Sequence, residues 1–397
     1  MIRLLHTADW QIGRTYGFLD ADDAAALADA RLAAVERIAQ AAAAGGADAV
    51  LVAGDVFDAQ ALSSRSIRRL FHALESYAGP WVMIAGNHDA ALSEGVWAEA
   101  QRLAVVPPHA RLMLQPGVLE LPAQRLALLC APLTQRHTPD DGTAWFDHAD
   151  TPAGWLRVGL AHGAVQGLLA DDIDAANPIA PDRAARAKLD YLALGDWHGT
   201  RRIDDRTWYS GTPEPDRFKD NAAGQVLWVE LDGPGAPPRV QPQAIAQHRW
   251  RRLPRALASG GDVDALRAEL ADAGRGDVLQ LVLQGTLDLA AHQALQQLLD
   301  ETQARVRSLL AERDGLRLAP TADDIAALQA EGYLGTLIAE LRDTRAGAGA
   351  DADAGANPNP NPNSNSDTAQ DALALLTQLL ADRRARRPGP AAPEAAR

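Results

Sequence analysis

The sequence predicts an α/β fold built in layers, with β-sheets flanked by helices, followed by a small α/β domain and a flexible C-terminal tail. In the first half of the chain, short apolar runs alternate with longer amphipathic segments, as in sheets that are covered by helices. A stretch rich in Pro and Gly at residues 233–242 indicates a connector before a second set of elements. Residues 345–368, dominated by Gly, Ala, Asp, Asn and Pro, cannot form a core.

The strands of the first half are predicted from short apolar runs, of the kind buried on both faces of a sheet. They are Ile2–Leu5, Ala49–Ala53, Trp81–Ala85, Leu126–Cys130, Val158–Ala161, Tyr191–Leu194, Trp208–Tyr209 and Val226–Leu231. A helix is expected over Asp22–Ala44, because its apolar residues follow the helical period and Gly45-Gly46 can end it. Ser63 or Ser64 can cap a second helix.

The second half predicts a smaller domain and a tail. Val278–Val282 has the pattern of a strand, and Leu289–Arg313 and Asp323–Arg342 each have the pattern of a helix. We therefore expect domains at residues 1–240 and 241–344, a disordered linker at 345–368, and an amphipathic helix with a basic end at 369–397. That last helix either docks on its own chain or binds a partner, and a partner is favoured because a short tethered helix is marginal alone.

Composition narrows the class of protein. The chain has 38 Lys and Arg against 52 Asp and Glu, a net charge of -14, so it is not expected to coat nucleic acid unaided. The acidic surface suits a site that gathers divalent cations, but ordinary solubility would explain it equally. The single cysteine, Cys130, cannot form an internal disulfide and fits a reducing cytoplasm. We expect no signal peptide, because the N-terminus runs straight into a strand-like segment, and no apolar run reaches the roughly 18–20 residues that a membrane span needs.

Five polar clusters carry the chemistry, and each directly follows an apolar run. They are His6–Gln11, Gly54–Asp58, Gly86–Asp89, His162-Gly163 and Gly195–His198. In open α/β sheets, ligands bind beyond the carboxyl ends of the strands, so these clusters should line one crevice. Their carboxylates, amide oxygens and imidazoles suit divalent metals such as manganese, iron or zinc, while the absence of cysteine excludes a thiolate site.

Each cluster alone is weak, because a Gly-Asp pair is usually a turn and a single His after a strand is usually hydrogen-bonded. The ordered set of five is what predicts a metal site. A shared carboxylate such as Asp55 could bridge two ions, which together can clamp a phosphate during its displacement.

The order of these motifs resembles that of the calcineurin-like metallophosphoesterases. Three segments, His6–Trp10, Ala53–Asp58 and Tyr191–Gly195, and also Tyr209–Glu214, closely resemble the SbcD-like DNA repair exonuclease subunits. The likeness is specific over roughly residues 1–230. Beyond that it is architectural, because the family places a capping domain and a partner-binding tail there. The family also suggests a homodimer.

The resemblance implies roles for individual residues. One metal ion would be held by Asp9, Gln11, Asp55 and His198, and the other by Asp55, Asn87, His162 and Asp196. The catalytic residue His88 would steady the scissile phosphate or protonate the leaving oxygen. Asp58 would orient His88, although a role as a helix or turn cap explains Asp58 equally well.

Two positions depart from the family pattern, which usually has His where this chain has Gln11 and Asp196. Both replacements make the site richer in oxygen, which favours manganese or magnesium. A Gln carbonyl binds metal more weakly than imidazole does, so Gln11 could instead contact the ligands without binding the metal itself.

Other residues beside the motifs have two interpretations each. Trp10, Phe57 and Trp197 could stack on a base, but packing beneath the site is favoured. Arg14 could contact a phosphate or lie on the surface.

Three functions follow from this resemblance. The leading hypothesis is the nuclease subunit of a DNA repair exonuclease that uses two divalent ions, Mn²⁺ above all, and works with an SbcC-like coiled-coil ATPase. The second is a stand-alone phosphodiesterase or phosphatase on small substrates. The third is a non-catalytic regulatory subunit with a degraded site, for which Gln11 and Asp196 are the only support.

Overall fold

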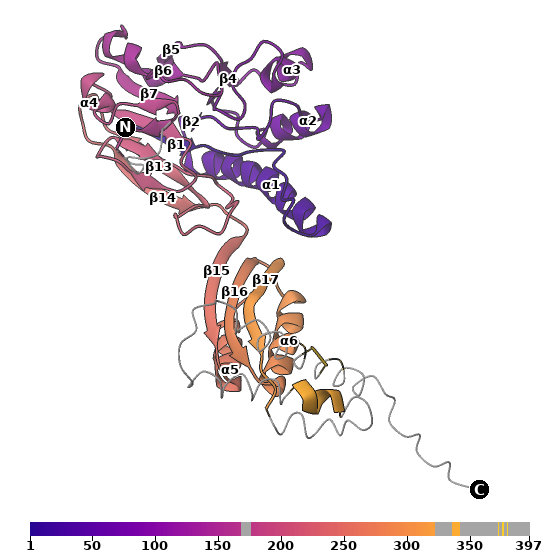
Figure 1. The fold of residues 1–397 in the computed structure, drawn as a ribbon. Helices are drawn as coiled ribbons and strands as arrows, with labels where there is room; N and C mark the ends of the chain where they lie inside the picture. The colour runs from indigo at the N-terminus through magenta and orange to yellow at the C-terminus, as the bar shows by residue number, and fades with distance from the viewer. Residues whose placement is uncertain (168–175, 322–335, 342–371, 373–374, 377–378, 380–397) are drawn as a thin grey trace, which may run out of the picture. The chain divides into compact units, whose positions relative to one another are not determined.

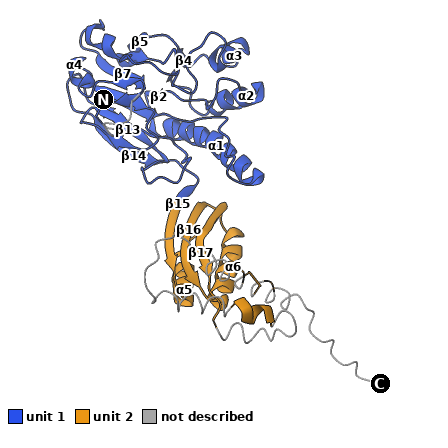
Figure 2. Cartoon of the chain, in the orientation of Figure 1, with its two compact units in different colours: residues 1–250 blue, residues 251–397 orange. Residues whose placement is uncertain are grey.

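The computed structural model describes residues 1–167, 176–321 and 336–341, together with residues 372, 375, 376 and 379. The chain divides into two compact units, Met1–Trp250 and Arg251–Arg397 (Figure 2). No helix among the described residues is long and apolar enough to cross a membrane.

Unit 1 contains two six-stranded sheets. The first has the order β14-β13-β1-β2-β3-β4, and β1 to β4 run parallel while β13 and β14 are antiparallel to their neighbours. Its strands are β1 (Ile2–Thr7), β2 (Ala49–Val52), β3 (Trp81–Ile84), β4 (Ala110–Met113), β13 (Gln225–Leu231) and β14 (Arg239–Ala244). The parallel strands predicted to carry the first three polar clusters are therefore neighbours.

The second sheet has the order β11-β12-β10-β7-β6-β5, with a parallel centre and antiparallel edge strands. Its strands are β5 (Gly117–Leu121), β6 (Leu126–Ala131), β7 (Leu156–His162), β10 (Tyr191–Gly195), β11 (Arg201–Arg202) and β12 (Thr207–Tyr209). A separate pair, β8 (Ala164–Val165) and β9 (Pro178–Ile179), follows β7. The strands with the last two clusters, β7 and β10, are adjacent here.

The two sheets pack face to face, and helices cover the outer faces (Figure 1). Residues alternate between two cores along each central strand: in β2, Val50 packs with the helices and Leu51 packs with the second sheet. The helices over the first sheet are α1 (Ala21–Gly45), α2 (Ser64–Ala73) and α3 (Val96–Arg102), and α4 (Arg183–Arg186) lies by the second. This double burial explains why the strands read as uninterrupted apolar runs.

The predicted helix ends are confirmed. Helix α1 ends where Gly46 adopts a left-handed conformation (φ 64°) and donates its backbone N–H to Ala42 and Ala43. Ser63 caps α2, because its side chain accepts a hydrogen bond from the backbone N–H of Ser66 at 3.1 Å.

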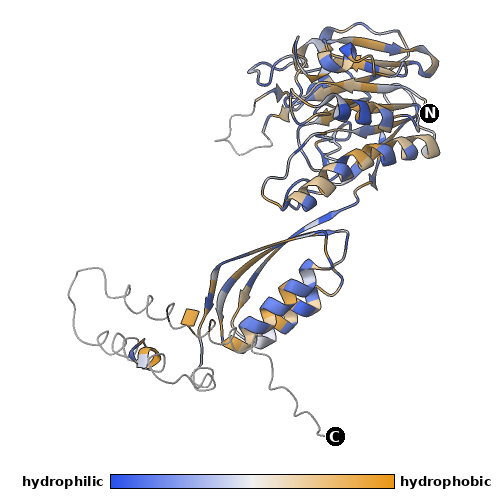
Figure 3. Ribbon diagram, turned by 90° about the vertical axis from the view of Figure 1, so that its right-hand side faces the viewer, coloured by the Kyte–Doolittle hydropathy of each residue, from blue (hydrophilic) through white to orange (hydrophobic). Residues whose placement is uncertain are grey.

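The described part of unit 2 contains a three-stranded sheet, with helices α5 and α6 between its strands. The elements are β15 (Arg249–Leu257), whose first two residues belong to unit 1, then α5 (Gly260–Glu269), β16 (Asp277–Leu287), α6 (Leu289–Gln303) and β17 (Ser308–Leu318), in the strand order β15-β16-β17. Leu295, Leu298 and Leu299 of α6 pack into its core, and the opposite face of α6 is largely hydrophilic (Figure 3).

The prediction of one helix over Leu289–Arg313 is wrong. The helix ends at Gln303, and Ser308–Ala311 pairs in parallel with Val278–Leu281 as part of β17. The hydrogen bonds of β16, which is distant in sequence, decide the conformation of this segment against its local helical pattern.

The connector predicted at residues 233–242 is shorter than expected, because Arg239–Ala244 forms β14 and pairs with β13. The boundary between the units accordingly lies after Trp250, ten residues beyond the predicted end at 240. Of the predicted helix Asp323–Arg342, residues 336–341 are described and helical. The predicted linker at 345–368 and nearly all of the tail at 369–397 lie outside the described residues.

Candidate metal centre

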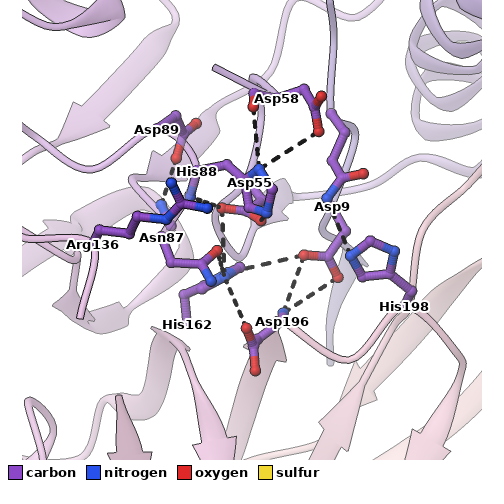
Figure 4. Close-up of polar contacts among 12 residues, drawn as sticks. Asp9, Asp55, Asp58, Asn87, His88, Asp89, Arg136, His162, Asp196 and His198 are labelled. Carbon is purple, nitrogen blue, oxygen red and sulfur yellow. Dashed lines mark hydrogen bonds and ion pairs between the residues drawn. The ribbon is translucent and has the colours of Figure 1, made fainter. Parts of the chain in front are cut away.

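The five polar clusters meet beyond the carboxyl ends of β1, β2, β3, β7 and β10, as the sequence predicts. Ligand atoms of Asp9, Asp55 and His162 all lie within 4.8 Å of one another, and all three residues are buried. Figure 4 shows Asp9, Asp55, His162 and Asp196 pointing toward a common centre, with His88 and Asp58 at one side and His198 beside Asp9. Residues from both sheets therefore build one site.

Strained backbone presents these side chains. Asp9, Gln11, Asp55 and Asp196 all have positive φ, between 46° and 102°, which is uncommon for residues with a side chain. Hydrogen bonds hold the strained loops, because Asp9 N–H donates to Gly54 and Gln11 N–H donates to Asp55. Such strain persists where the surroundings fix it, and it is concentrated at functional sites.

Close approach of the strands requires glycine at two positions. A Cβ on Gly86 would lie 2.2 Å from the Asp55 carboxylate, and one on Gly54 would lie 2.5 Å from the ring of His162. The glycines of the motifs therefore allow the carboxylate and imidazole to converge.

His162 is fixed with Nε2 toward the other side chains of the cluster (Figure 4). Its Nδ1–H donates to the backbone carbonyl of Ala53 at 2.8 Å, so Nε2 carries the lone pair whenever the ring is neutral. Nε2 lies 3.3 Å from Asn87 Oδ1, 3.5 Å from Asp55 Oδ1 and 3.7 Å from Asp196 Oδ1. Three oxygen acceptors thus surround Nε2, an arrangement that a proton or a bound cation would stabilise.

His198 is oriented by a residue that the sequence analysis missed. Its Nδ1–H donates to Asp216 Oδ2 at 3.0 Å. Burial acts to raise the pKa of Asp216, but hydrogen bonds from His198 and Arg217 outweigh it and hold that pKa well below its usual range. An ionised carboxylate behind a histidine is a common support of metal sites.

Burial and mutual repulsion govern the charges of the site. Burial, with a contribution from Asp55, raises the pKa of Asp9 to about 6 and also raises the pKa of Asp196. Burial opposes charge on His162, but the carboxylates of Asp55, Asp196 and Asp9 outweigh it and raise the pKa of His162 to about 9. The cluster therefore retains protons at neutral pH that a bound cation would displace.

The pair His88 and Asp58 lies at the open side of the site. His88 Nδ1 is 3.1 Å from the backbone carbonyl oxygen of Asp58 and 3.6 Å from its carboxylate. The contact expected between these residues is present, although the closer acceptor is the main chain. His88 Nε2 lies 4.0 Å from Asp55 Oδ2, and the side chain is 30% exposed. His88 can therefore reach both the buried cluster and an incoming ligand.

Asp89, the last residue of its motif, supports the site from behind. Its carboxylate accepts hydrogen bonds from the backbone N–H groups of Gly86, Val56 and Phe57 at 2.6–3.1 Å. Burial and the nearby Asp55 raise the pKa of Asp89 to about 7. Asp89 thus joins the loops after β2 and β3, a role that its motif alone does not reveal.

Arg31 is a second supporting residue that the sequence analysis missed. It is 1% exposed and donates to the backbone carbonyls of Asp9, Trp10 and Glu214 and to the hydroxyl of Thr212. The sequence did contain a sign that Arg31 is buried, because it lies four residues after Leu27 and four before Val35, on the apolar face of α1.

The remaining sequence candidates differ in burial and in contacts. Trp10 and Phe57 are fully buried, which confirms packing beneath the site, whereas Trp197 is partly exposed. Arg14 forms ion pairs with Asp58 and Asp216, each at 3.3 Å.

Paired sheets with carboxylates, amides and imidazoles at their carboxyl ends define the metal-dependent phosphoesterases as a class. A family model, "Calcineurin-like phosphoesterase", matches residues 2–221. The chain therefore belongs to the calcineurin-like phosphoesterase family, on its SbcD-like branch, and is a metal-dependent phosphoester hydrolase.

Two curated relatives give the measure of this likeness. The chain is 33% identical over 290 residues to the SbcD subunit of the SbcCD nuclease of Rhodobacter capsulatus. That alignment covers 60% of this chain and 69% of the relative. The chain is 27% identical over 281 residues to the DNA double-strand break repair protein Mre11 of Aeropyrum pernix, covering 66% of each. A solved structure of a protein from Thermus thermophilus aligns with 62% of this chain and 99% of that chain, with a TM-score of 0.38 and 14% identity.

The protons held by the site predict that metal affinity depends on pH. Cation binding needs ionised Asp9 and neutral His162, so Mn²⁺ affinity should rise as the pH is raised from about 6 to about 9. Isothermal titration calorimetry in buffers of different ionisation enthalpy should detect release of about one proton or more per ion near pH 7. An affinity that does not change over this range would contradict the prediction.

Proposed function

We propose that the chain is the nuclease subunit of a DNA repair exonuclease, hydrolysing phosphodiester bonds with two Mn²⁺ ions and working with an SbcC-like ATPase. The observation that carries this proposal is the convergence of Asp9, Asp55 and His162 within 4.8 Å. The names of the two relatives, a nuclease subunit and a DNA break repair protein, support DNA as the substrate.

The donor atoms suit a pair of cations that share Asp55. Asn87, His162 and Asp196 would complete one position, while Asp9 and His198, with Gln11 beside them, would complete the other. When bound, divalent ions acidify water and neutralise charge on a phosphate. The protein would contribute the fixed imidazoles, His162 held by Ala53 and His198 held by Asp216.

His88 would act on the phosphodiester itself. Its position at the open side of the site lets it donate a proton to the leaving oxygen or a hydrogen bond to the phosphate. Asp58 would orient the ring from Nδ1.

Each domain of the chain would have its own role. The first domain would hold the nuclease site, the residues beyond it would form a cap, and residues 369–397 would bind the ATPase. A net charge of -14 fits a subunit that relies on a partner to clamp DNA. The single buried cysteine fits a cytoplasmic protein, and a homodimer is part of the proposal.

Two cations beside the site are suited to hold the DNA backbone. Arg201 and Lys219 lie over the ring of Trp197, at 5.0 Å and 4.6 Å. Neither has an ion pair with a carboxylate among the described residues, and Trp197 stands between Asp196 and His198. They can therefore neutralise phosphates next to the one being cut.

Removing both cations should weaken binding of an oligonucleotide. In the double variant Arg201→Ala, Lys219→Ala we expect an affinity loss of about tenfold or more and a salt dependence shallower by about two units on a log–log plot. Fluorescence anisotropy with a labelled oligonucleotide measures both. Hydrolysis of bis-p-nitrophenyl phosphate, which has a single phosphate, should change little. Equal losses on the two substrates would argue against a strand-binding role.

The proposed function is tested with the full chain. Purified protein with Mn²⁺ should hydrolyse bis-p-nitrophenyl phosphate, and it should degrade linear DNA faster when the ATPase partner and ATP are present. Full activity on small diesters with none on DNA, even with the partner, would favour the stand-alone phosphodiesterase. Loss of co-purification on deleting residues 369–397 would identify the tail as the contact, and unchanged co-purification would move that role to the cap.

A further inference from the structure

We infer that Gln11 is a positioning residue rather than a metal ligand, and that the two cation positions therefore bind with unequal affinity. This inference rests on the proposed function. It comes from a closed ring of four side chains, Arg14, Gln11, His198 and Asp216. Arg14 Nη1 donates to Gln11 Oε1 at 2.9 Å, and Gln11 Nε2 lies 3.1 Å from His198 Nε2. His198 Nδ1 bonds to Asp216 Oδ2 at 3.0 Å, and Arg14 Nη2 closes the ring to the same oxygen at 3.3 Å.

Elementary donor and acceptor chemistry fixes each atom in this ring. A guanidinium has donors only, so Arg14 must face the carbonyl oxygen of Gln11 rather than its amide nitrogen. An ionised carboxylate has acceptors only, so Asp216 must receive the Nδ1–H of His198. Arg217 Nη2, which lies 2.8 Å from Nδ1, donates to Asp216 Oδ2 at 2.9 Å. His198 Nε2 is thus the acceptor of an N–H from Gln11.

The ring hinders a cation on the His198 side. The lone pair that His198 would offer a metal already accepts a hydrogen bond, and the Gln11 oxygen points at a guanidinium. The positive charge of Arg14 also opposes a second cation nearby. For an ion to bind, Gln11 must move away from His198.

The His162 side has no such obstacle. His162 Nε2 lies 3.3 Å from Asn87 Oδ1 and 3.5 Å from Asp55 Oδ1; both oxygens are acceptors, so loss of the ring proton leaves a lone pair to which neither donates. The close group of ligand atoms among the described residues, Asp9, Asp55 and His162, includes a residue proposed for each position besides the shared Asp55, so the difference between the positions rests on His162 and His198. The His162 side is therefore the tight position and the His198 side the weak one.

The test is a titration of the full metal-free chain with Mn²⁺ alone. Binding is measured by calorimetry and by the electron paramagnetic resonance signal of free Mn²⁺. The wild type should bind one ion tightly and a second at least about tenfold more weakly. Gln11→His should strengthen the second position about tenfold or more and leave the first unchanged. Arg14→Met should act in the same direction, because it frees the Gln11 carbonyl. Arg65→Met, on the exposed side of α2, is the matched control and should change neither constant.

Two equal constants in the wild type would overturn the inference, and so would a second constant that neither Gln11→His nor Arg14→Met alters. In both cases the proposed function would stand if hydrolysis persists. A wild type that binds no Mn²⁺ would overturn both. Circular dichroism and the melting temperature of each variant confirm that the compared proteins are folded.

Discussion

Asp55→Asn is expected to abolish tight Mn²⁺ binding and to lower phosphodiester hydrolysis about a thousandfold. Asp55 is 1% exposed and belongs with Asp9 and His162 to the close group of ligand atoms. Asn keeps the oxygen that accepts the His88 backbone N–H at 2.9 Å, but it removes the charge. Loss of about 4 kcal/mol of charge stabilisation in the transition state corresponds to a thousandfold slower reaction.

The fold should survive this substitution. Removing the Asp55 charge relieves its repulsion of Asp9 and Asp196, which offsets the lost attraction to the protonated ring of His162. We therefore expect the melting temperature without metal to stay equal or increase, while metal no longer raises it. Asp150→Asn, at an exposed aspartate, is the control and should retain metal and activity. Wild-type turnover in Asp55→Asn would remove the basis for the metal centre.

Much of this centre could be predicted from the sequence, because its side chains follow directly on apolar strands. The carboxyl ends of parallel strands meet at one edge of a sheet, so residues such as Asp9, Asp55 and Asn87 converge for a topological reason. Their residue types then indicate metal chemistry without further structural information.

The supporting shell could not be predicted in this way. Asp216 lies 18 residues beyond His198 and Arg31 lies 22 residues beyond Asp9, and no periodic pattern links either pair. Asp216 lies in a loop and belongs to none of the five polar clusters. Of these two residues, only Arg31 could have been noticed in the sequence, as a charged residue on the apolar face of a helix. Contacts of this kind depend on how loops from different elements pack.

The second unit shows the limit of periodicity. The apolar residues of 289–313 fit a helical pattern, but Ser308–Leu318 is a strand because β16 is available to pair with it. A short apolar run can serve either conformation, so a distant partner strand decides the outcome. The domain boundary lies later in the chain than predicted for the same reason, since the pairing of β14 with β13 extends unit 1.

His88→Ala should lower turnover on DNA by about 10² to 10⁴ without loss of bound Mn²⁺, the range typical of general acid catalysis. The metal should remain because His88 lies at the open side of the site, with Nε2 4.0 Å from Asp55 Oδ2. Metal content by mass spectrometry and single-turnover rates on a short duplex measure the two effects separately. A variant as fast as the wild type would contradict a catalytic role for His88.

The leaving group distinguishes the two roles open to His88. A p-nitrophenolate leaves without a proton, whereas the sugar oxygen of DNA needs one. If His88 protonates the leaving oxygen, His88→Ala should slow DNA cleavage far more than cleavage of bis-p-nitrophenyl phosphate. If it steadies the phosphate, both substrates should slow alike, and His88→Asn, which keeps a hydrogen-bond donor without a titratable proton, should restore part of both rates. The contact of Nδ1 with the Asp58 backbone carbonyl at 3.1 Å leaves Nε2 facing the site in either role, so the comparison of rates decides between them.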